Sequence, residues 1–206
     1  TSIARRERAE AEAKIRGFTI IPPFDHPEII AGQGTVGVEI LEDCDQVSTV
    51  YVPIGGGGLI SGVGAAVKRM RPGVRIVGVE PEGGAAMTAS ITAGKPVTLE
   101  RVQSVADGLL PVRPGDLTFT HVSEFVDDVI TVKDDEIIKA VQWLMTTAKL
   151  VVEPSGAATV AAVLFQSGGA QLAHQGVTVA VLSGGNIEHE LLVSLFPDAA
   201  RVSSEQ

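Results

Sequence analysis

The chain has 206 residues, of which 45% are hydrophobic and 20% are charged, so it can bury a substantial core and is not expected to be disordered. Its formal net charge of -9 argues against nucleic acid or an anionic membrane as the main partner and favours small molecules. The single cysteine, Cys44, cannot form a disulfide within the chain, no apolar run reaches about 18 residues, and no signal peptide is visible, so we expect a cytoplasmic protein.

The first predicted elements precede a glycine-rich turn. Residues 3–16 are rich in Ala, Glu, Arg and Lys, which favours a solvated helix ending at Gly17. We expect a short strand at 18–21 and a helix over 35–41, which Gly32-Gln33-Gly34 would introduce.

The rest of the chain alternates between strands and helices. Strands made largely of Val, Ile and Ala, separated by helices, are typical of an open, mostly parallel α/β sheet with helices on both faces. Residues 94–119 fit neither pattern and should form a long loop, which in a compact domain is more often functional than idle. The predicted strands are 48–54, 74–79, 129–132 and 177–182, and the predicted helices are 59–70, 85–93, 134–149, 157–165 and one from about 187.

Four consecutive glycines, Gly55 to Gly58, join a predicted strand to a predicted helix. Without a Cβ, their backbone N–H groups can approach an anion closely, and the helix after them adds the positive end of its dipole. This order predicts a phosphate site, and the alternative is a flexible turn between two packed elements. This run contains no G-x-G-x-x-G, because positions 60 and 61 are Ile and Ser, and no G-K-[ST] follows it, so the common nucleotide motifs do not fit the run.

Polar residues come after other predicted strands at the same edge of the sheet. In a parallel sheet the carboxyl ends of the strands meet at one edge, where ligands bind. We therefore expect Glu80 and the segment Ser183-Gly184-Gly185-Asn186 to face one crevice with the glycine run. The alternatives are a solvated strand end for Glu80, a helix cap for Ser183, and a helix-dipole partner for Glu153.

We assign no functional site to the histidines, the acidic pairs or the residues Trp143 and Met145. The four histidines show no metal-ligand spacing, and we interpret them as surface or hydrogen-bonded side chains. The pairs Asp127-Asp128 and Asp134-Asp135 are interpreted as solvated loop and cap residues. Trp143 and Met145 fall within a predicted helix and should belong to the core or to an interface.

Six motifs in order resemble one enzyme family along nearly the whole chain. They are similar to those of the serine/threonine dehydratase and serine racemase group of fold-type II pyridoxal-phosphate enzymes. The motifs are Ile30-Ala31-Gly32-Gln33-Gly34-Thr35, Gly55 to Gly58, Val79-Glu80-Pro81, Ala106-Asp107-Gly108, Val152-Glu153-Pro154-Ser155-Gly156-Ala157 and Leu182-Ser183-Gly184-Gly185-Asn186.

The resemblance implies a cofactor site and a reaction. The backbone amides of Gly55, Gly56, Gly57, Gly58 and Leu59 would bind the phosphate of pyridoxal 5'-phosphate. Ser183 would hydrogen-bond the pyridine nitrogen, and Gly184 and Glu153 would also belong to the cofactor site. The implied enzyme is an ammonia-lyase that removes the α-proton and the β-hydroxyl of L-threonine or L-serine and releases a 2-oxo acid and ammonia.

The family's lysine motif is missing from this sequence. In the family, the Schiff-base lysine lies in an N-terminal Ser-x-Lys-x-Arg-type motif, and none of the six lysines here has that setting. The chain therefore resembles the C-terminal two thirds of such an enzyme, with residues 1–20 as the tail of the small substrate domain and 21–206 as the large cofactor domain. We expect the fragment alone to be inactive.

A divalent cation (Mg, Mn or Ca) is a further implication of the resemblance. In metal-dependent members a glutamate, a backbone carbonyl and an aspartate hold the ion, at positions that correspond to Glu80, Gly84 and Ala86 here. Ala86 offers no carboxylate, which argues against the metal, and Glu82 is a nearby carboxylate that could compensate.

Competing hypotheses stay open. A serine racemase would share the α-proton step, whereas a non-catalytic cofactor-binding fragment or an unrelated nucleotide-phosphate domain would show no turnover. The resemblance implies a homodimer or a higher homo-oligomer.

Overall fold

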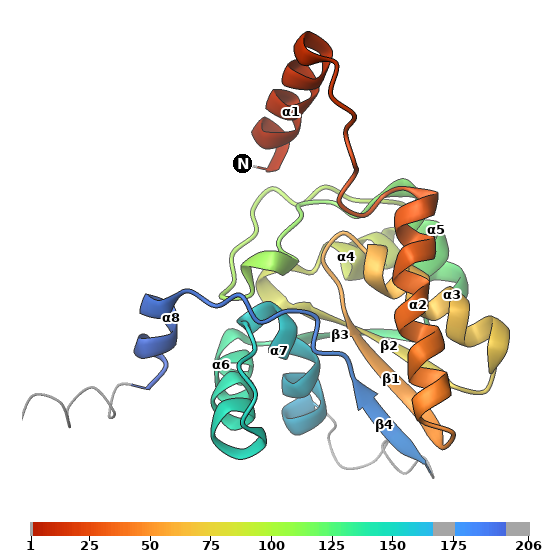
Figure 1. Ribbon diagram of the computed structural model, residues 1–206, viewed down its shortest axis with the longest axis vertical. Coiled ribbons are helices and arrows are strands. Elements are labelled where there is room, and N and C mark those ends of the chain that lie inside the picture. The colour runs from red at the N-terminus through yellow and green to blue at the C-terminus, as the bar shows by residue number, and fades with distance from the viewer. Residues whose placement is uncertain (1, 167–175, 197–206) are drawn as a thin grey trace, which may run out of the picture.

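The computed structural model describes residues 2–166 and 176–196, and within these ranges four parallel strands form one sheet in the order β3-β2-β1-β4 (Figure 1). The strands are β1 (Val47–Pro53), β2 (Arg75–Pro81), β3 (Asp128–Val132) and β4 (Val177–Ala180). All three neighbouring pairs are parallel, with Tyr51 of β1 opposite both Val77 of β2 and Ala180 of β4. The predicted open parallel sheet is confirmed.

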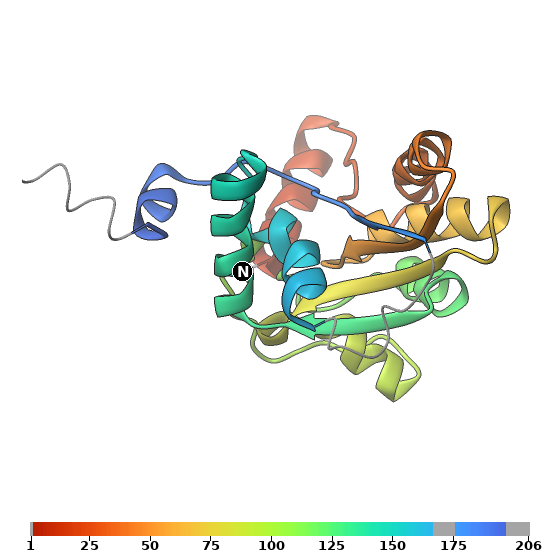
Figure 2. The same cartoon turned by 90° about the horizontal axis from the view of Figure 1, so that it is seen from below.

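Helices cover both faces of this sheet (Figure 2). Successive side chains of a strand point to opposite faces, so Val50 and Val52 enter one core while Tyr51 enters the other. Helices α2 (Pro27–Asp43), α3 (Gly58–Met70), α4 (Ala86–Ala93) and α5 (Asp116–Phe125) contribute to the first core. Helices α6 (Asp134–Trp143) and α7 (Pro154–Ala161) contribute to the second.

The order in which the chain adds strands to the sheet reverses at β1. From β1 the chain proceeds through β2 to β3, and then returns to place β4 on the other side of β1. The segments that leave the carboxyl ends of β1 and β4 therefore start side by side, as the hydrogen bond of 3.0 Å from Val181 N to Tyr51 O shows. In open parallel sheets such a switch point is where a ligand crevice forms.

Helix α2 is longer than the sequence suggested. It begins at Pro27, with the ring nitrogen of His26 accepting from Glu28 N at 3.3 Å, and not after Gly34. The glycines serve a different purpose, because α2 and α3 cross with their backbones in contact. A Cβ on Gly34 would lie 3.3 Å from the carbonyl oxygen of Gly62, and a Cβ on Gly62 would overlap the backbone of α2.

Two other predictions are wrong. Residues 18–21 form no strand: the structure places no partner strand beside them, Phe18 is 60% exposed and Ile21 is 77% exposed. The predicted loop 94–119 ends earlier, because α5 begins at Asp116 and buries Thr118, Val122 and Phe125 along one face.

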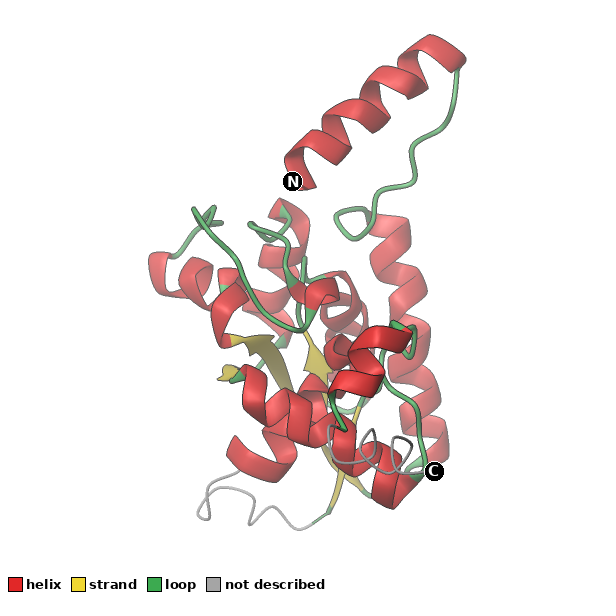
Figure 3. Ribbon diagram, turned by 90° about the vertical axis from the view of Figure 1, so that its left-hand side faces the viewer, coloured by secondary structure: helices red, strands yellow, loops and turns green. Residues whose placement is uncertain are grey.

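The remaining elements agree with the sequence in kind and differ at their ends. Helix α1 (Ser2–Arg16) is joined to the body by an extended segment and stands apart from it (Figure 3). Helices α6 and α7 each continue as a π-helical turn. The shorter elements are η1 (Glu82–Gly84), η2 (Asp107–Leu109), η3 (Leu144–Ala148), η4 (Ala162–Gln166) and α8 (His189–Ser194).

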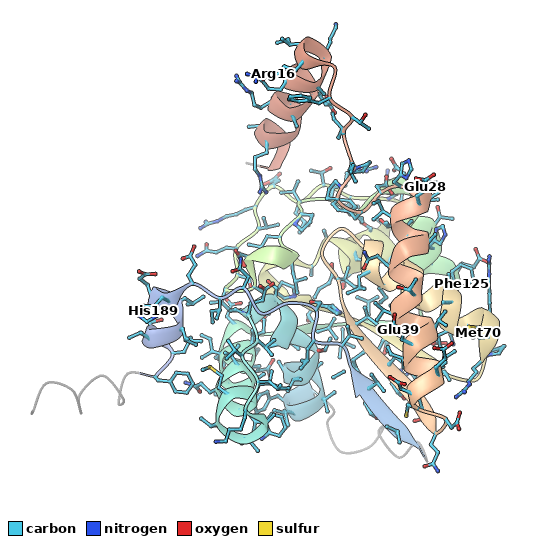
Figure 4. All side chains as sticks on the ribbon, in the orientation of Figure 1. Arg16, Glu28, Glu39, Met70, Phe125 and His189 are labelled. Atoms are coloured by element: carbon cyan, nitrogen blue, oxygen red, sulfur yellow. The ribbon has the colours of Figure 1, made fainter. Side chains whose placement is uncertain are left out.

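Exposed polar side chains mark the outer surface. Figure 4 shows Glu28 and Glu39 along α2, Arg16 on the separate helix α1 and His189 on α8.

Within the described ranges, no helix is both long enough and apolar enough to cross a membrane. The ring Nδ1 of His121 lies 2.9 Å from Leu117 O, in line with a hydrogen-bonded histidine, whereas His174 lies outside the described residues.

Candidate cofactor site

The tetraglycine run forms a buried turn directly between β1 and α3. Gly56, Gly57 and Gly58 are buried, and Gly57 has a φ of 95°, a left-handed conformation that favours glycine. Among the residues that the structure describes, the N–H groups of Gly55 to Leu59 donate to no partner, whereas Ser61 N donates to Gly57 O at 3.0 Å. A set of buried and partly buried backbone donors without partners is uncommon in a folded protein and is the arrangement that an anion completes.

Side chains from three other elements support this turn. A Cβ on Gly57 would lie 2.9 Å from Met87 Cε and 3.0 Å from Thr118 Oγ1, so these two side chains pack against it. A Cβ on Gly56 would overlap the ring of Phe24. The glycines are thus required by packing as well as by the open donor groups.

The carbonyl side of the turn is held by α5. Thr118 is fully buried and donates from Oγ1 to Gly56 O at 2.7 Å, and Gly115 N donates to the same oxygen at 3.3 Å. Ser61 Oγ in turn donates to Thr118 O at 3.3 Å. Sequence reasoning missed Thr118 because it assigned this segment to a loop, although the spacing of Thr118, Val122 and Phe125 is helical.

Glu80 lies at the end of β2 and is fully buried, so the alternative of a solvated strand end is wrong. Its Oε1 accepts from Met87 N at 2.7 Å, and its Oε2 accepts from Thr88 N at 2.9 Å and Thr88 Oγ1 at 2.7 Å. Burial raises the pKa of the Glu80 carboxyl from its ordinary value of 4.5, and the hydrogen bonds from Thr88 and Met87 act in the opposite direction. The carboxylate therefore caps the N-terminus of α4.

This cap bears on the predicted cation site. Both carboxylate oxygens of Glu80 already have hydrogen-bond donors, Gly84 is buried, and Ala86 contributes only a methyl group. In the described part of the chain, no group of three or more His, Cys, Asp or Glu side chains is arranged to hold a metal ion. The cation at Glu80 and Gly84 stays a prediction.

Glu153 faces the segment after β4. Its Oε2 accepts from Asn186 N at 2.9 Å, its backbone N donates to Gly184 O at 3.2 Å, and a Cβ on Gly184 would lie 2.6 Å from Oε1. The half-buried carboxylate thereby fixes the loop that carries Ser183, whose own side chain is exposed. Glu153 therefore does more than interact with the dipole of α7, because it connects the start of α7 to the loop after β4.

The segment around Gly108 connects the two halves of the site. Gly108 N donates to Ser155 Oγ at 2.9 Å, and a Cβ on Gly108 would lie 3.8 Å from Glu153 Oε1. On its other side, a Cβ on Gly55 would lie 3.1 Å from Gly108 O. The tetraglycine turn, Gly108, Glu153 and the loop at Gly184 therefore lie next to one another. Glu80, which we expected to face the same crevice, is instead fully buried with its hydrogen bonds to α4.

The arrangement suits a phosphorylated ligand with an attached ring. Free amides at the start of a helix can bind a dianionic phosphate, and the exposed hydroxyl of Ser183 belongs to a loop that starts beside the same strand end. The residues present therefore fit the phosphate end of pyridoxal 5'-phosphate.

Comparison with known proteins agrees with this geometry. The family model described as pyridoxal-phosphate dependent enzyme matches residues 1–184. An L-threonine ammonia-lyase of Thermotoga maritima is 44% identical over 190 residues, which are 90% of this chain and 46% of that protein. The chain thus spans about half the length of the curated relatives that it matches.

Two solved structures place the same architecture in this group. A threonine deaminase from T.th. has a TM-score of 0.82 at 39% identity, and the match covers 88% of this chain and 62% of that one. Maize serine racemase has a TM-score of 0.86 at 36% identity, and the match covers 97% of this chain and 61% of that one. The resemblance drawn from the motifs is thereby confirmed, and the chain belongs to the family of pyridoxal-phosphate dependent enzymes.

Proposed function

We propose that this chain is the cofactor-binding part of a pyridoxal-phosphate dependent ammonia-lyase acting on L-threonine or L-serine. The observation that carries the proposal is the turn Gly55 to Gly58, in which the last three glycines are buried and the N–H groups have no partner among the described residues. The similarity to a Thermotoga maritima L-threonine ammonia-lyase supports the reaction. The products would be ammonia and a 2-oxo acid, namely 2-oxobutanoate from threonine and pyruvate from serine.

Each part of the site would have a separate task. The amides of Gly55 to Leu59 would hold the cofactor phosphate, with the N-terminal dipole of α3 favouring its negative charge. When bound, pyridoxal phosphate supplies an electron sink for removal of the substrate α-proton. Ser183 would offer its hydroxyl to the ring nitrogen, while Glu153 and Gly184 would keep that loop in place.

Domain assignment and assembly are also part of the proposal. Residues 1–20 would belong to the small substrate domain and residues 21–206 to the large cofactor domain. The position of α1 apart from the sheet supports this division (Figure 1). The assembled enzyme would be a homodimer or a higher homo-oligomer.

A serine racemase is the second candidate, supported by the high structural similarity to the maize serine racemase over 97% of this chain. Both reactions begin with removal of the α-proton, so they differ in the next step. A racemase would return a proton to the other face of the same carbon and release D-serine, whereas a lyase releases the β-hydroxyl group.

The test uses two samples and separates cofactor binding from chemistry. The 206-residue chain is titrated with pyridoxal 5'-phosphate by isothermal calorimetry and should bind it with no sustained oxo-acid production, because no lysine has the family's setting. The same chain fused to an N-terminal segment that carries the lysine motif should release 2-oxobutanoate from L-threonine. D-serine in place of oxo acid would favour the racemase, and absence of cofactor binding by both samples would contradict the proposal.

A further inference from the structure

Asp25 lies between α1 and α2 but contacts a distant helix. Its carboxylate accepts three backbone N–H groups at the start of α5: Oδ2 accepts from Asp116 at 3.1 Å, and Oδ1 accepts from Leu117 at 3.0 Å and from Thr118 at 3.1 Å. These donors are 91 to 93 residues away in the sequence. Gly115, at the N-cap of α5, has no side chain to satisfy them, so Asp25 caps this helix from another part of the chain.

The first turn of α5, which Asp25 holds, is also the part that contacts the tetraglycine turn. Thr118 donates from Oγ1 to Gly56 O at 2.7 Å, and Gly115 N donates to the same oxygen at 3.3 Å. Phe24, the residue before Asp25, packs its ring against Gly56 and its Cβ against Gly58. The segment at Phe24 and Asp25 therefore contacts the turn directly and also through α5.

Because the peptide bond is planar, holding the carbonyl of Gly56 also fixes the direction of the N–H of the next residue. The carbonyl of Gly56 and the N–H of Gly57 belong to one trans peptide unit and point in opposite directions. Because Thr118 and Gly115 fix the carbonyl, the N–H of Gly57 is directed away from α5. The next unit is fixed in the same way, since Ser61 N donates to Gly57 O and thereby orients the N–H of Gly58.

We propose that Asp25 is a positioning residue for the phosphate donors of the tetraglycine turn and acts through the first turn of α5. The inference rests on the proposed function, because it assigns the turn to the cofactor phosphate. Asp25 itself touches α5 and not the phosphate. A mere helix cap would contribute to stability alone, whereas a positioning residue also changes how the phosphate is held.

The experiment measures phosphate binding and stability in parallel. Pyridoxal 5'-phosphate is titrated into the purified chain by calorimetry, the 31P resonance of the bound phosphate is recorded at saturation, and unfolding in urea is followed for each variant. Asp25→Ala removes all three contacts, and Asp25→Asn keeps one accepting oxygen. Thr118→Val removes the hydroxyl that holds Gly56 while leaving Asp25 in place.

Matched controls come from the same region. Glu28→Gln removes an exposed carboxylate three residues from Asp25, at the start of α2 (Figure 4). Thr120→Val removes an exposed hydroxyl of α5 that donates only to Asp116 O within its own helix. Neither control should move the 31P resonance or the cofactor affinity.

We expect Asp25→Ala to weaken cofactor binding about tenfold, because the N–H groups of the turn would no longer be held in the direction that binds the phosphate. The 31P resonance should shift, with Asp25→Asn intermediate and Thr118→Val similar to Asp25→Ala. The double variant should show less than the sum of the two losses, because both act on the same carbonyl. If Asp25→Ala does not fold, Asp25→Asn and Thr118→Val carry the test.

Two results would overturn parts of the scheme separately. Absence of pyridoxal 5'-phosphate binding by both the unsubstituted chain and its lysine-bearing fusion would contradict the proposed function, and the positioning role would fall with it. Wild-type binding with unchanged affinity and unchanged 31P resonance in Asp25→Asn and Thr118→Val would contradict the positioning role alone, whatever those variants do to stability.

Discussion

The buried carboxylate of Glu80 accepts a hydrogen bond of 2.7 Å from the N–H of Met87, at the N-terminus of α4. The methyl end of Met87 in turn fills the space beside Gly57, where a Cβ would lie 2.9 Å from it. The end of β2 is therefore connected to the tetraglycine turn after β1 through one side chain. A change at Glu80 should reach the candidate cofactor site by way of Met87.

The first prediction concerns the pH dependence that Glu80 gives to stability. Burial raises the pKa of this carboxyl above 4.5 in the folded state. The folded protein thus holds the proton more tightly than the unfolded chain, so this contribution to stability is fully present below the unfolded pKa. It is lost as the pH rises through the higher folded-state value. Glu80→Gln cannot ionise and should lack this dependence.

The measurement is urea unfolding of wild type and Glu80→Gln from about pH 4 to about pH 8. The free energy of unfolding of wild type, relative to the variant, should fall as the pH rises. Glu82→Gln, which removes an exposed carboxylate two residues away, is the control. The raised pKa of Glu80 would be contradicted if the difference in the free energy of unfolding between wild type and Glu80→Gln did not change with pH. It would also be contradicted if wild type became more stable relative to the variant as the pH rises.

The second prediction concerns Gly57. With a φ of 95°, any other L-residue is strained there by about 1–2 kcal/mol, and its Cβ would also press on Met87 and Thr118. Gly57→Ala should therefore destabilise the fold and weaken binding of pyridoxal 5'-phosphate, measured by calorimetry. The cause differs from a simple filling of the anion site, because the added atom would point toward these two side chains.

Gly94 provides a matched control for Gly57. It also has a positive φ, 67°, but a Cβ there would meet nothing within 4 Å. Gly94→Ala should lose similar stability to backbone strain and keep its cofactor affinity. Equal affinity losses in both variants would show that strain alone, and not the position beside the turn, controls binding.

The third prediction concerns Thr49 in β1. Its side chain is 2% exposed, and its hydroxyl has no hydrogen-bond partner among the described residues. Thr49→Val replaces this hydroxyl by a methyl group of similar size and should raise the free energy of unfolding by about 1 kcal/mol. Thr159→Val is the opposite case, because Thr159 Oγ1 donates to Val181 O at 3.0 Å, and it should be destabilising. Urea unfolding of both variants measures whether Thr49→Val raises the free energy of unfolding while Thr159→Val lowers it.

The sheet was predictable because its signals are local. Each of the four strands is a short run of branched apolar residues next to a helix, and the glycine run after β1 marks its own turn. The expectation that the Ser183 loop begins beside the glycine run came from one rule, that parallel strands end at the same edge. These predictions needed no knowledge of which strands are neighbours.

The supporting contacts could not be predicted, because they join distant segments. Nothing near Asp25 in the sequence indicates that it caps a helix more than 90 residues later. The same holds for Glu80, which could equally have been exposed because charged residues usually are, yet is buried with its hydrogen bonds to α4. The strand expected at 18–21 failed for a related reason, since a strand forms only where a partner strand is present.

The last prediction concerns Ser183 and rests on the proposed function. Its side chain is exposed in a loop that Glu153 holds through Asn186 N and Gly184 O, so the hydroxyl is free to meet a ligand without being needed for packing. A neutral hydroxyl at the ring nitrogen should leave the cofactor a weaker electron sink than a carboxylate would, and alanine at this position would offer the nitrogen no hydrogen bond at all. Ser183→Ala should therefore lower elimination turnover in the lysine-bearing fusion while leaving phosphate binding within about twofold of wild type.

Three measurements distinguish this role from a cap. The turnover with L-threonine should fall in Ser183→Ala, the visible spectrum of the bound cofactor should change in Ser183→Asp, and the calorimetric affinity should stay close to wild type in Ser183→Ala. Ser123→Ala, which removes an exposed hydroxyl of α5 that donates to Phe119 O at 2.9 Å, should change none of them. Wild-type turnover together with a wild-type spectrum in both Ser183 variants would show that Ser183 has no contact with the ring. Its place in the loop would then be structural, because Glu153 fixes that loop through backbone groups that neither substitution removes.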